Sequence, residues 1–240
     1  MSRRAEVVFS PALFPYRRLK ENTIIVISDI LRATTSICAA FNHGVGAIIP
    51  VETLEEARVY KDKGYIVAGE RIEHSFEFAD FGNSAYDFMN DDIIGKEVVH
   101  STTNGTVAIT TAKEGGGDEV LIGSFTNLKV LTDYILEKNH DVIVLCSGWN
   151  NQFCLEDSVY AGALLDVLTT GFTIRDDAAI ACIELWYRAK DDLKGFMEKA
   201  SHLHRLRKYN MGEVFDLTFT LNTMPVIPRL EGDRLVDIFK

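Results

Sequence analysis

The segment that decides the fold reads Thr23-Ile24-Ile25-Val26-Ile27-Ser28. A strand with one face in water alternates apolar and polar side chains, whereas the four inner positions of this segment are all apolar. Both faces of the strand are therefore expected to be covered by helices. Residues 141–146 have the same pattern, with Val142-Ile143-Val144-Leu145 at the centre. Together the two segments predict the central strands of a largely parallel sheet.

Short β-branched runs recur along the chain at intervals that leave room for one helix each. Further strands are expected at residues 47–51, 65–68, 97–100 and 119–122. Helices are expected at residues 33–42, 54–63, 104–113, 126–139 and 156–169. Strands that alternate with helices are typical of an α/β fold. The prediction is a three-layer α/β/α sandwich on a largely parallel, mixed sheet.

The domain organisation expected from the sequence is simple. A chain of 240 residues without a linker-like segment predicts one α/β domain over residues 1–240. Residues 191–240 differ in character, because a basic helix-like piece precedes a strand-like piece there. They are the candidate for a packed C-terminal lobe.

Charge and composition restrict the partners. The chain has 35 acidic and 25 basic residues and a formal net charge of −10. Binding nucleic-acid phosphates needs a surplus of Lys and Arg, so no nucleic-acid partner is expected. A small anion responds to the local field of its pocket and is not excluded. Residues 1–20 lack the apolar run of a signal peptide, and no segment suits lipid, so we expect a cytoplasmic protein without a membrane partner.

Polar loops follow the carboxyl ends of five expected strands. In parallel sheets, ligands bind at these ends, where the loops that lead into helices meet. The loops span residues 28–35, 69–71, 101–106, 123–127 and 147–151, with Glu156 and Asp157 a turn after the last. A ligand site is therefore expected at this edge of the sheet.

The loop Ser101-Thr102-Thr103-Asn104-Gly105-Thr106 is rich in small hydroxyl residues. Backbone N–H groups and hydroxyls at the start of a helix can surround a phosphate, sulfonate or carboxylate. The alternative is a simple helix cap, since Ser, Thr and Asn all serve that role. One cap needs only one such residue, so the run favours an anion site.

Acidic residues at the same edge suggest a metal site. Asp29 directly follows an apolar strand, and Arg32 lies three residues on, where a guanidinium can clamp an oxyanion. Glu70 and Arg71 repeat this pairing, and Glu156-Asp157 adds two carboxylates. Carboxylates from several strand ends suit Mg²⁺. The alternatives are local ion pairs and acids that favour the first turn of a helix.

Other patterns narrow the chemistry. The four cysteines lack CxxC spacing and predict buried free thiols. His202 and His204 are two residues apart, which places them on different faces of a helix, so a solvated basic face is favoured over a shared metal. The alternative is that one of the two side chains closes over an anionic ligand. The sequence contains no GxxxxGK[ST], no GxGxxG after the first strand, no HExxH and no GxSxG. Metal-assisted chemistry on a small anion remains.

The ordered set of motifs resembles the 2-phosphosulfolactate phosphatase family. The matching segments are Asp29-Ile30-Leu31-Arg32-Ala33-Thr34-Thr35, Gly69-Glu70-Arg71, Gly82-Asn83-Ser84, Ser101-Thr102-Thr103-Asn104-Gly105-Thr106, Gly123-Ser124 with Asn127, and Glu156-Asp157 before Ala161-Gly162. The resemblance implies a Mg²⁺-dependent enzyme that hydrolyses 2-phospho-3-sulfolactate to 3-sulfolactate and phosphate, a step of coenzyme M biosynthesis. It also implies a homodimer.

The resemblance and the loop positions lead to specific residue roles. Asp29, together with Glu70, Glu156 or Asp157, would hold Mg²⁺, and Asp29, Glu70 and Asp157 are the expected catalytic residues. Substrate binding is assigned to Arg32, Arg71, Asn83, Ser84, Ser101, Thr102, Thr103, Asn104, Gly105, Thr106, Ser124 and Asn127.

The sequence leaves alternatives open for the nucleophile, the substrate and the function. The nucleophile is either metal-activated water or a carboxylate. The substrate is either phosphosulfolactate or another 2-phospho acid, because Ile72-Glu73-His74 and Ala85 depart from the family's pattern. The competing function is a non-catalytic protein that binds small phosphorylated or sulfonated acids.

Overall fold

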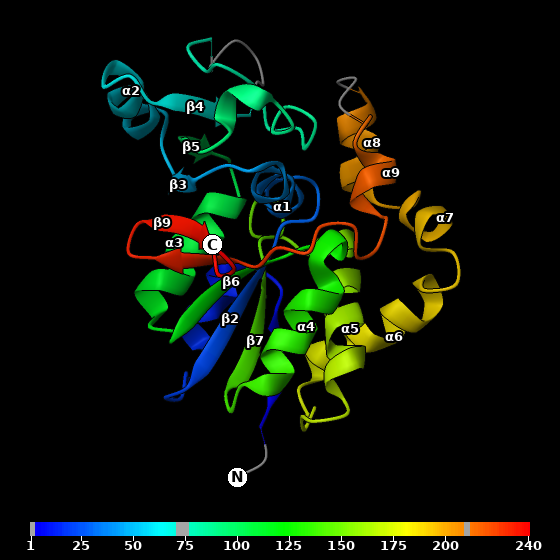
Figure 1. The fold of residues 1–240 in the computed structure, drawn as a ribbon. Coiled ribbons are helices and arrows are strands. Elements are labelled where there is room, and N and C mark those ends of the chain that lie inside the picture. The colour runs from blue at the N-terminus through cyan, green and yellow to red at the C-terminus, as the bar shows by residue number, and fades with distance from the viewer. Residues whose placement is uncertain (1–2, 71–76, 209–211) are drawn as a thin grey trace.

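The computed structural model describes residues 3–70, 77–208 and 212–240, which form one nine-stranded sheet with helices on both faces (Figure 1). The strands are β1 (Ala5–Val8), β2 (Thr23–Ser28), β3 (Ala47–Val51), β4 (Ile66–Gly69), β5 (Glu97–Ser101), β6 (Glu119–Gly123), β7 (Asp141–Cys146), β8 (Pro228–Glu231) and β9 (Arg234–Asp237). Their order across the sheet is β1-β7-β2-β6-β8-β9-β3-β5-β4. The predicted strands 23–28, 47–51 and 141–146 are confirmed with the same bounds.

A hairpin from the end of the chain joins two parallel halves of the sheet. In one half β1, β7, β2 and β6 run parallel, and in the other β3, β5 and β4 run parallel. β8 and β9 pair antiparallel, and they touch the two halves through the pairs Leu121–Arg229 and Ile48–Leu235. The sheet is therefore mixed and largely parallel, and the predicted α/β class is confirmed.

The helices follow the strands in the expected alternation. They are α1 (Ala33–His43), α2 (Leu54–Asp62), α3 (Gly105–Gly115), α4 (Leu128–Glu137), α5 (Leu155–Leu168), α6 (Asp177–Ala189), α7 (Leu193–Met197), α8 (Ser201–Lys208) and α9 (Phe215–Thr218). Short 3₁₀ helices η1 (Pro11–Tyr16), η2 (Asp91–Ile93) and η3 (Phe125–Asn127) lie between them. The predicted helix 126–139 is thus divided into η3 and α4.

Successive residues of β2 face opposite layers of the core. Ile24 and Val26 pack with residues of α4, α5 and α6, whereas Ile25 and Ile27 pack with residues of α1 and α3. All four side chains are fully buried. The continuous apolar run of β2 is therefore explained by helices on both faces, as Figure 1 shows.

The C-terminal part of the chain contributes to both the core and the sheet. Leu193, Leu203 and Leu206 of α7 and α8 pack in the same cluster as α4–α6, and β8 and β9 lie within the sheet. A lobe that begins at residue 191 stays a prediction. All four cysteines are free and buried, as expected.

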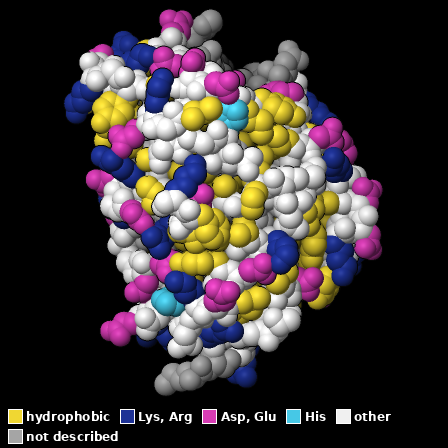
Figure 2. Space-filling model, viewed as in Figure 1, with side chains coloured by type: hydrophobic (Ala, Val, Ile, Leu, Met, Phe, Trp, Pro, Cys, Tyr) yellow, Lys and Arg dark blue, Asp and Glu magenta, His cyan; other side chains and the backbone are white. Residues whose placement is uncertain are grey.

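The surface mixes charges of both signs. On the face drawn in Figure 2, acidic and basic side chains are interspersed, with apolar side chains between them. In the part of the chain that the structure describes, no helix combines the length and apolarity that crossing a membrane requires.

Candidate active site

The structure gathers acidic residues at the carboxyl ends of the parallel strands. Asp29 follows β2, Glu70 follows β4, and Glu156 and Asp157 lie in the first turn of α5, after β7. Asp29, Glu156 and Asp157 are buried. Glu70 and Glu156 both act electrostatically on Asp29, and so does His202 of α8. Residues that are far apart in the sequence therefore form one acidic site.

Asp29 is a buried carboxyl group with an unused oxygen. Its Oδ1 accepts a long hydrogen bond of 3.4 Å from the Ala33 amide, and its Oδ2 has no hydrogen-bond donor in residues 3–70, 77–208 or 212–240. Burial, aided by the nearby carboxylates of Glu70 and Glu156 and opposed by His202, raises the pKa of Asp29 to about 6. A buried carboxylate that forms no ion pair within the described residues is costly to keep ionised, which suits a ligand of a metal ion.

Gly105 allows the hydroxyl-rich loop to approach Asp29. A Cβ atom at this position would lie 2.6 Å from the Cβ of Ala33 and 2.9 Å from Oδ2 of Asp29. Both distances are too short for any side chain, so only glycine lets the start of α3 pack here. The 101–106 loop and the acidic residues therefore belong to the same site.

Asp157 holds two loops together. Its Oδ1 accepts a hydrogen bond of 2.9 Å from the Ile30 amide, and its Oδ2 accepts one of 3.1 Å from the Gly148 amide. Burial raises the pKa of Asp157 well above its usual range, and Glu156 and Asp29 add to this effect. Both oxygens of this carboxylate thus fix the backbone next to Asp29.

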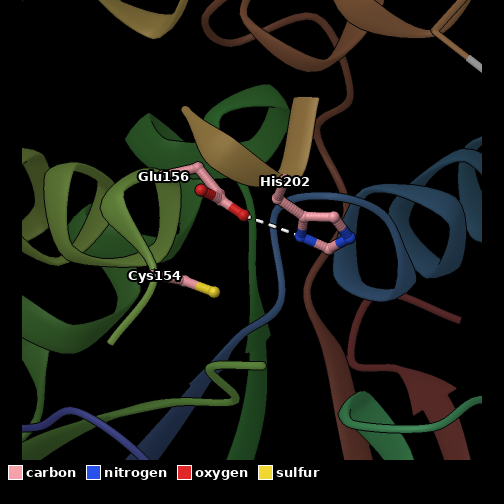
Figure 3. A group of neighbouring side chains, drawn as sticks. All are labelled: Cys154, Glu156 and His202. Atoms are coloured by element: carbon pink, nitrogen blue, oxygen red, sulfur yellow. Dashed lines mark hydrogen bonds and ion pairs between the residues drawn. The ribbon is translucent and has the colours of Figure 1, made fainter. Parts of the chain in front are cut away.

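Glu156 pairs with a histidine that the sequence did not assign to the site. Its Oε1 lies 2.8 Å from Nδ1 of His202, and the Cys154 thiol lies beside this pair (Figure 3). The prediction of a solvated basic face is wrong for His202, whose side chain is 14% exposed, and holds for His204, which is exposed. Burial raises the pKa of Cys154, and the carboxylates of Asp157 and Glu156 raise it further.

Arg32 brings a buried positive charge to this edge of the sheet. Its Nη2 lies 3.9 Å from Oε1 of Glu70, and the side chain is 5% exposed. Oε2 of Glu70 accepts hydrogen bonds from the amide and the hydroxyl of Thr103. Arg71 and the segment Ile72-Glu73-His74 lie outside the described residues.

Two hydrogen bonds within the 101–106 loop involve its own hydroxyl groups. The Thr102 Oγ1 accepts a hydrogen bond of 3.2 Å from the Thr106 amide, and the Thr106 hydroxyl donates one of 2.6 Å to the Thr102 carbonyl. Asn104 occupies the N-cap position of α3, but its side chain makes no capping bond. Its Oδ1 instead accepts a hydrogen bond of 3.3 Å from the Asn150 amide. A simple Asn104 cap does not account for this loop.

Two further predicted residues lie near β5. The Asn83 Oδ1 is 2.7 Å from Nε2 of His100, and its carbonyl accepts a hydrogen bond of 2.9 Å from Ser36. Burial lowers the pKa of His100 to about 3, so this ring is neutral and its protonated nitrogen can donate to Asn83. Oγ of Ser84 accepts a hydrogen bond of 3.3 Å from the Tyr86 amide. Both predicted residues thus contact neighbouring protein groups.

Ser124 and Asn127 form a reciprocal cap at η3. The Ser124 amide donates a hydrogen bond of 2.9 Å to Oδ1 of Asn127, whose Nδ2 donates to the carbonyls of Ile122 and Val226. Oγ of Ser124 is 3.1 Å from Oγ1 of Thr35. These contacts position the loop after β6, and the substrate-binding roles of both residues stay predictions.

α8 contributes a second residue to this edge of the molecule. The guanidinium of Arg205 lies 4.0 Å from the ring centre of Trp149, in the loop after β7. Such a cation–π contact attaches α8 next to the strand ends. The pair His202 and His204 was the signal that the sequence offered for α8, but its helical spacing alone pointed to solvent.

The fold and the site define an α/β enzyme with a buried acidic site, compatible with a metal cofactor, at the carboxyl edge of its sheet. The chain matches the family described as 2-phosphosulpholactate phosphatase over residues 8–233, and it belongs to that family.

Similar proteins agree with this assignment. A protein of Clostridium novyi (strain NT) is 32% identical over 236 residues, which cover 97% of this chain and 99% of the relative. One of Caldicellulosiruptor saccharolyticus is 34% identical over 212 residues, covering 85% and 86%, and one of Thermotoga maritima is 32% identical over 206 residues, covering 85% and 88%. Each is named "Probable 2-phosphosulfolactate phosphatase".

Proposed function

We propose that the protein hydrolyses the phosphate ester of 2-phospho-3-sulfolactate, or of a similar 2-phospho acid, to the 2-hydroxy acid and phosphate. The observation that carries this proposal is the buried Asp29 carboxyl group, which lies beside other carboxylates and the hydroxyl-rich loop. Membership of the phosphatase family supports the reaction class.

Asp29 and Glu70 are the proposed Mg²⁺ ligands. Asp29 offers an oxygen without a hydrogen bond from the described chain, and Glu70 acts electrostatically on it from the end of β4. Mg²⁺ prefers one or two carboxylates together with water and substrate oxygens, and this donor set matches that preference. When bound, Mg²⁺ would offset the negative charge of the phosphoryl oxygens.

Positive and neutral donors are proposed to hold the substrate's anionic groups. Arg32 is buried beside Glu70 and can present its guanidinium to phosphate, carboxylate or sulfonate oxygens. The 101–106 loop offers backbone N–H groups at the positive end of the α3 dipole. Asp157 would act as a positioning residue, because it fixes the amides of Ile30 and Gly148.

The reaction adds one water molecule across the ester bond. The water oxygen forms the new bond to phosphorus, the bond from phosphorus to the ester oxygen breaks, and that oxygen takes a proton to become the hydroxyl group of the 2-hydroxy acid. Water that attacks directly, and a carboxylate that first takes the phosphoryl group, are both compatible with the residues around Asp29.

Phosphate release from a panel of 2-phospho acids tests the proposal. The purified protein is assayed with Mg²⁺, with and without chelator, on phosphosulfolactate, phospholactate and 2-phosphoglycerate. We expect release from at least one substrate, and loss of that release with chelator. Tight binding of a phospho acid without release from any of them would contradict the enzyme and favour the non-catalytic binding protein.

The cytoplasmic location and the homodimer also remain proposals. Both come from the sequence and its resemblance to the family. Light scattering of the purified protein over a range of concentrations tests the dimer, which predicts twice the 26.9 kDa mass of the chain.

A further inference from the structure

We propose that Cys154, Glu156 and His202 form a second cation site, beside Asp29 in the same acidic cluster, for a borderline divalent cation of the Zn²⁺ and Co²⁺ class. The Sγ atom, one carboxylate oxygen and one ring nitrogen all lie within 4.8 Å of one another. Figure 3 shows the three side chains around one small space, with Glu156 and His202 joined by a hydrogen bond. This site does not depend on the proposed phosphatase activity.

The fold brings these ligands together from two elements. Cys154 is the N-cap of α5 and Glu156 is the second residue of that helix, whereas His202 is the second residue of α8. Cys154 is 6% exposed and Glu156 is 2% exposed. Both helices pack into one hydrophobic cluster, so the three side chains are held on rigid elements.

The distances require only a small adjustment to bind an ion. Zinc ligands lie about 2.0–2.3 Å from the metal, so two ligands of a tetrahedral site are roughly 3.4–3.7 Å apart. The Glu156–His202 pair, at 2.8 Å, is already closer than this, and the widest separation exceeds it by about 1 Å. Small side-chain rotations are sufficient for such a change.

The donor set selects the class of ion. Sulfur and imidazole ligands favour Zn²⁺ and Co²⁺, whereas Mg²⁺ takes oxygen ligands and keeps its waters. The Cys154 thiol has no hydrogen-bond partner within the described ranges of the chain, so its lone pairs are free for a metal. Three protein ligands also leave a fourth position open, as in catalytic zinc sites. The bound ion would connect α8 to the start of α5.

Cobalt binding to the full-length protein provides the test. Co²⁺ is titrated into metal-free protein, and the near-ultraviolet charge-transfer band between sulfur and cobalt is recorded together with the binding stoichiometry. We expect one Co²⁺ per chain with a thiolate band, and competition by Zn²⁺ but not by Mg²⁺. Replacement of one of the three ligands should weaken Co²⁺ binding by at least about 10–100-fold. This is the loss in affinity that follows when a residue that only supports a metal ligand is replaced.

Matched variants assign the band to these residues. Cys154→Ser should abolish the band, and His202→Asn should weaken Co²⁺ binding, whereas Cys182→Ser and His204→Asn should retain both. Circular dichroism confirms that each variant is folded, and His202→Asn is the safer variant because the His202 side chain is 14% exposed whereas Cys154 is buried. A folded wild-type protein without a thiolate band at saturating Co²⁺, or a band that persists in Cys154→Ser, would overturn the site.

Discussion

The acidic residues at the two ends of the sheet lie in different environments. At the amino ends, Glu97, Glu119 and Asp141 begin β5, β6 and β7, and each forms an ion pair with a Lys or Arg. At the carboxyl ends, Asp29 and Asp157 are buried next to further carboxylates. The first group forms ion pairs with neighbouring cations, whereas Asp29 and Asp157 form none within the described residues, and His202 only partly offsets the raised pKa of Asp29.

This difference in environment distinguishes acidic residues with a structural role from those expected to bind a ligand. An ion pair at a partly exposed strand end contributes little stability and can be replaced at little cost. Burial of several carboxylates in one site destabilises the fold unless protons or cations neutralise them. Such a cluster is therefore expected where a ligand supplies the missing positive charge.

The largest expected effect comes from Asp29→Asn. Loss of the charged oxygen should reduce phosphate release by about 10²–10³-fold, because several kcal/mol of metal-derived stabilisation is lost. In Mg²⁺-free buffer at neutral pH, the same change should raise the free energy of unfolding by up to about 3 kcal/mol, since a desolvated charge is removed. The measurements are steady-state kinetics and urea denaturation.

Asp141→Asn is the matched control at the other end of the sheet. It removes an ion pair with Arg4, and a second with Lys20, each about 3.4–3.5 Å long. We expect activity within about twofold of the parent and a stability loss of about 1 kcal/mol or less. Comparable loss of activity in both variants would show that the two ends do not differ in function.

Asp157→Asn should stabilise the protein less than Asp29→Asn, because the benefit of removing a buried charge is offset by the loss of a hydrogen bond. Its carboxylate accepts hydrogen bonds from both Ile30 and Gly148, and an amide has only one acceptor oxygen. One buried N–H therefore loses its partner, which costs about 1–3 kcal/mol. Urea denaturation with a fitted midpoint measures this loss, and a stabilisation as large as that of Asp29→Asn would rule out the loop-fixing role.

The pH dependence of the free energy of unfolding reports on Asp29 without mutation. The pKa of Asp29 is raised from its ordinary value of 3.8 to about 6 in the folded protein, so the folded state binds this proton more tightly between these two pH values. The stability from this group is complete below pH 3.8 and is lost as the pH rises to about 6.

Mg²⁺ binding should show the reverse trend. Protons compete with the cation for Asp29, so affinity should fall about tenfold for each pH unit below the folded pKa. Calorimetric titration of Mg²⁺ between pH 5 and about 8 measures this trend. If the Mg²⁺ affinity of the parent protein does not change with pH, Asp29 is not a ligand of the metal.

The smallest effect is expected from Glu119→Gln. Glu119 accepts a hydrogen bond of 2.6 Å from the Tyr134 hydroxyl and lies 3.6 Å from Nζ of Lys138. A glutamine keeps an acceptor for Tyr134, so only the ion pair is lost, at about 0.2–1 kcal/mol. Thermal unfolding at low and high salt measures this loss, which should shrink as salt screens the pair. A larger, salt-independent loss would mean that Glu119 acts through packing.

Much of the fold could be predicted because its signals are local. The apolar run of β2 and the regular alternation of strands and helices identify a parallel sheet, and polar loops identify its functional edge. β1 was missed, because four residues carry too little periodicity to separate a strand from a loop. The place of the β8–β9 hairpin was missed as well, because strand order depends on contacts between distant segments.

The site residues also divide into those predicted from local sequence and those identified only from the structure. Asp29, Glu70 and Glu156 were predicted from their positions after strands, and the structure brings these three carboxylates close enough to interact. His202 was not predicted as a site residue, because its partner Glu156 is 46 residues away in the sequence. Helical spacing does not show which element packs against each face of a helix. The roles of Asn83, Ser84, Ser124 and Asn127 in substrate binding remain predictions.

The sequence by itself determined the class of fold, the edge of the sheet that carries the polar loops, and the family. These depend on short-range patterns, namely side-chain periodicity, turn residues and ordered motifs. Only the tertiary structure decided that β8 and β9 join two parallel halves, that Asp157 holds backbone amides, and that His202 meets Glu156 and Cys154. The physical reason is that these contacts depend on how distant segments pack, and packing energy is a property of the folded chain as a whole.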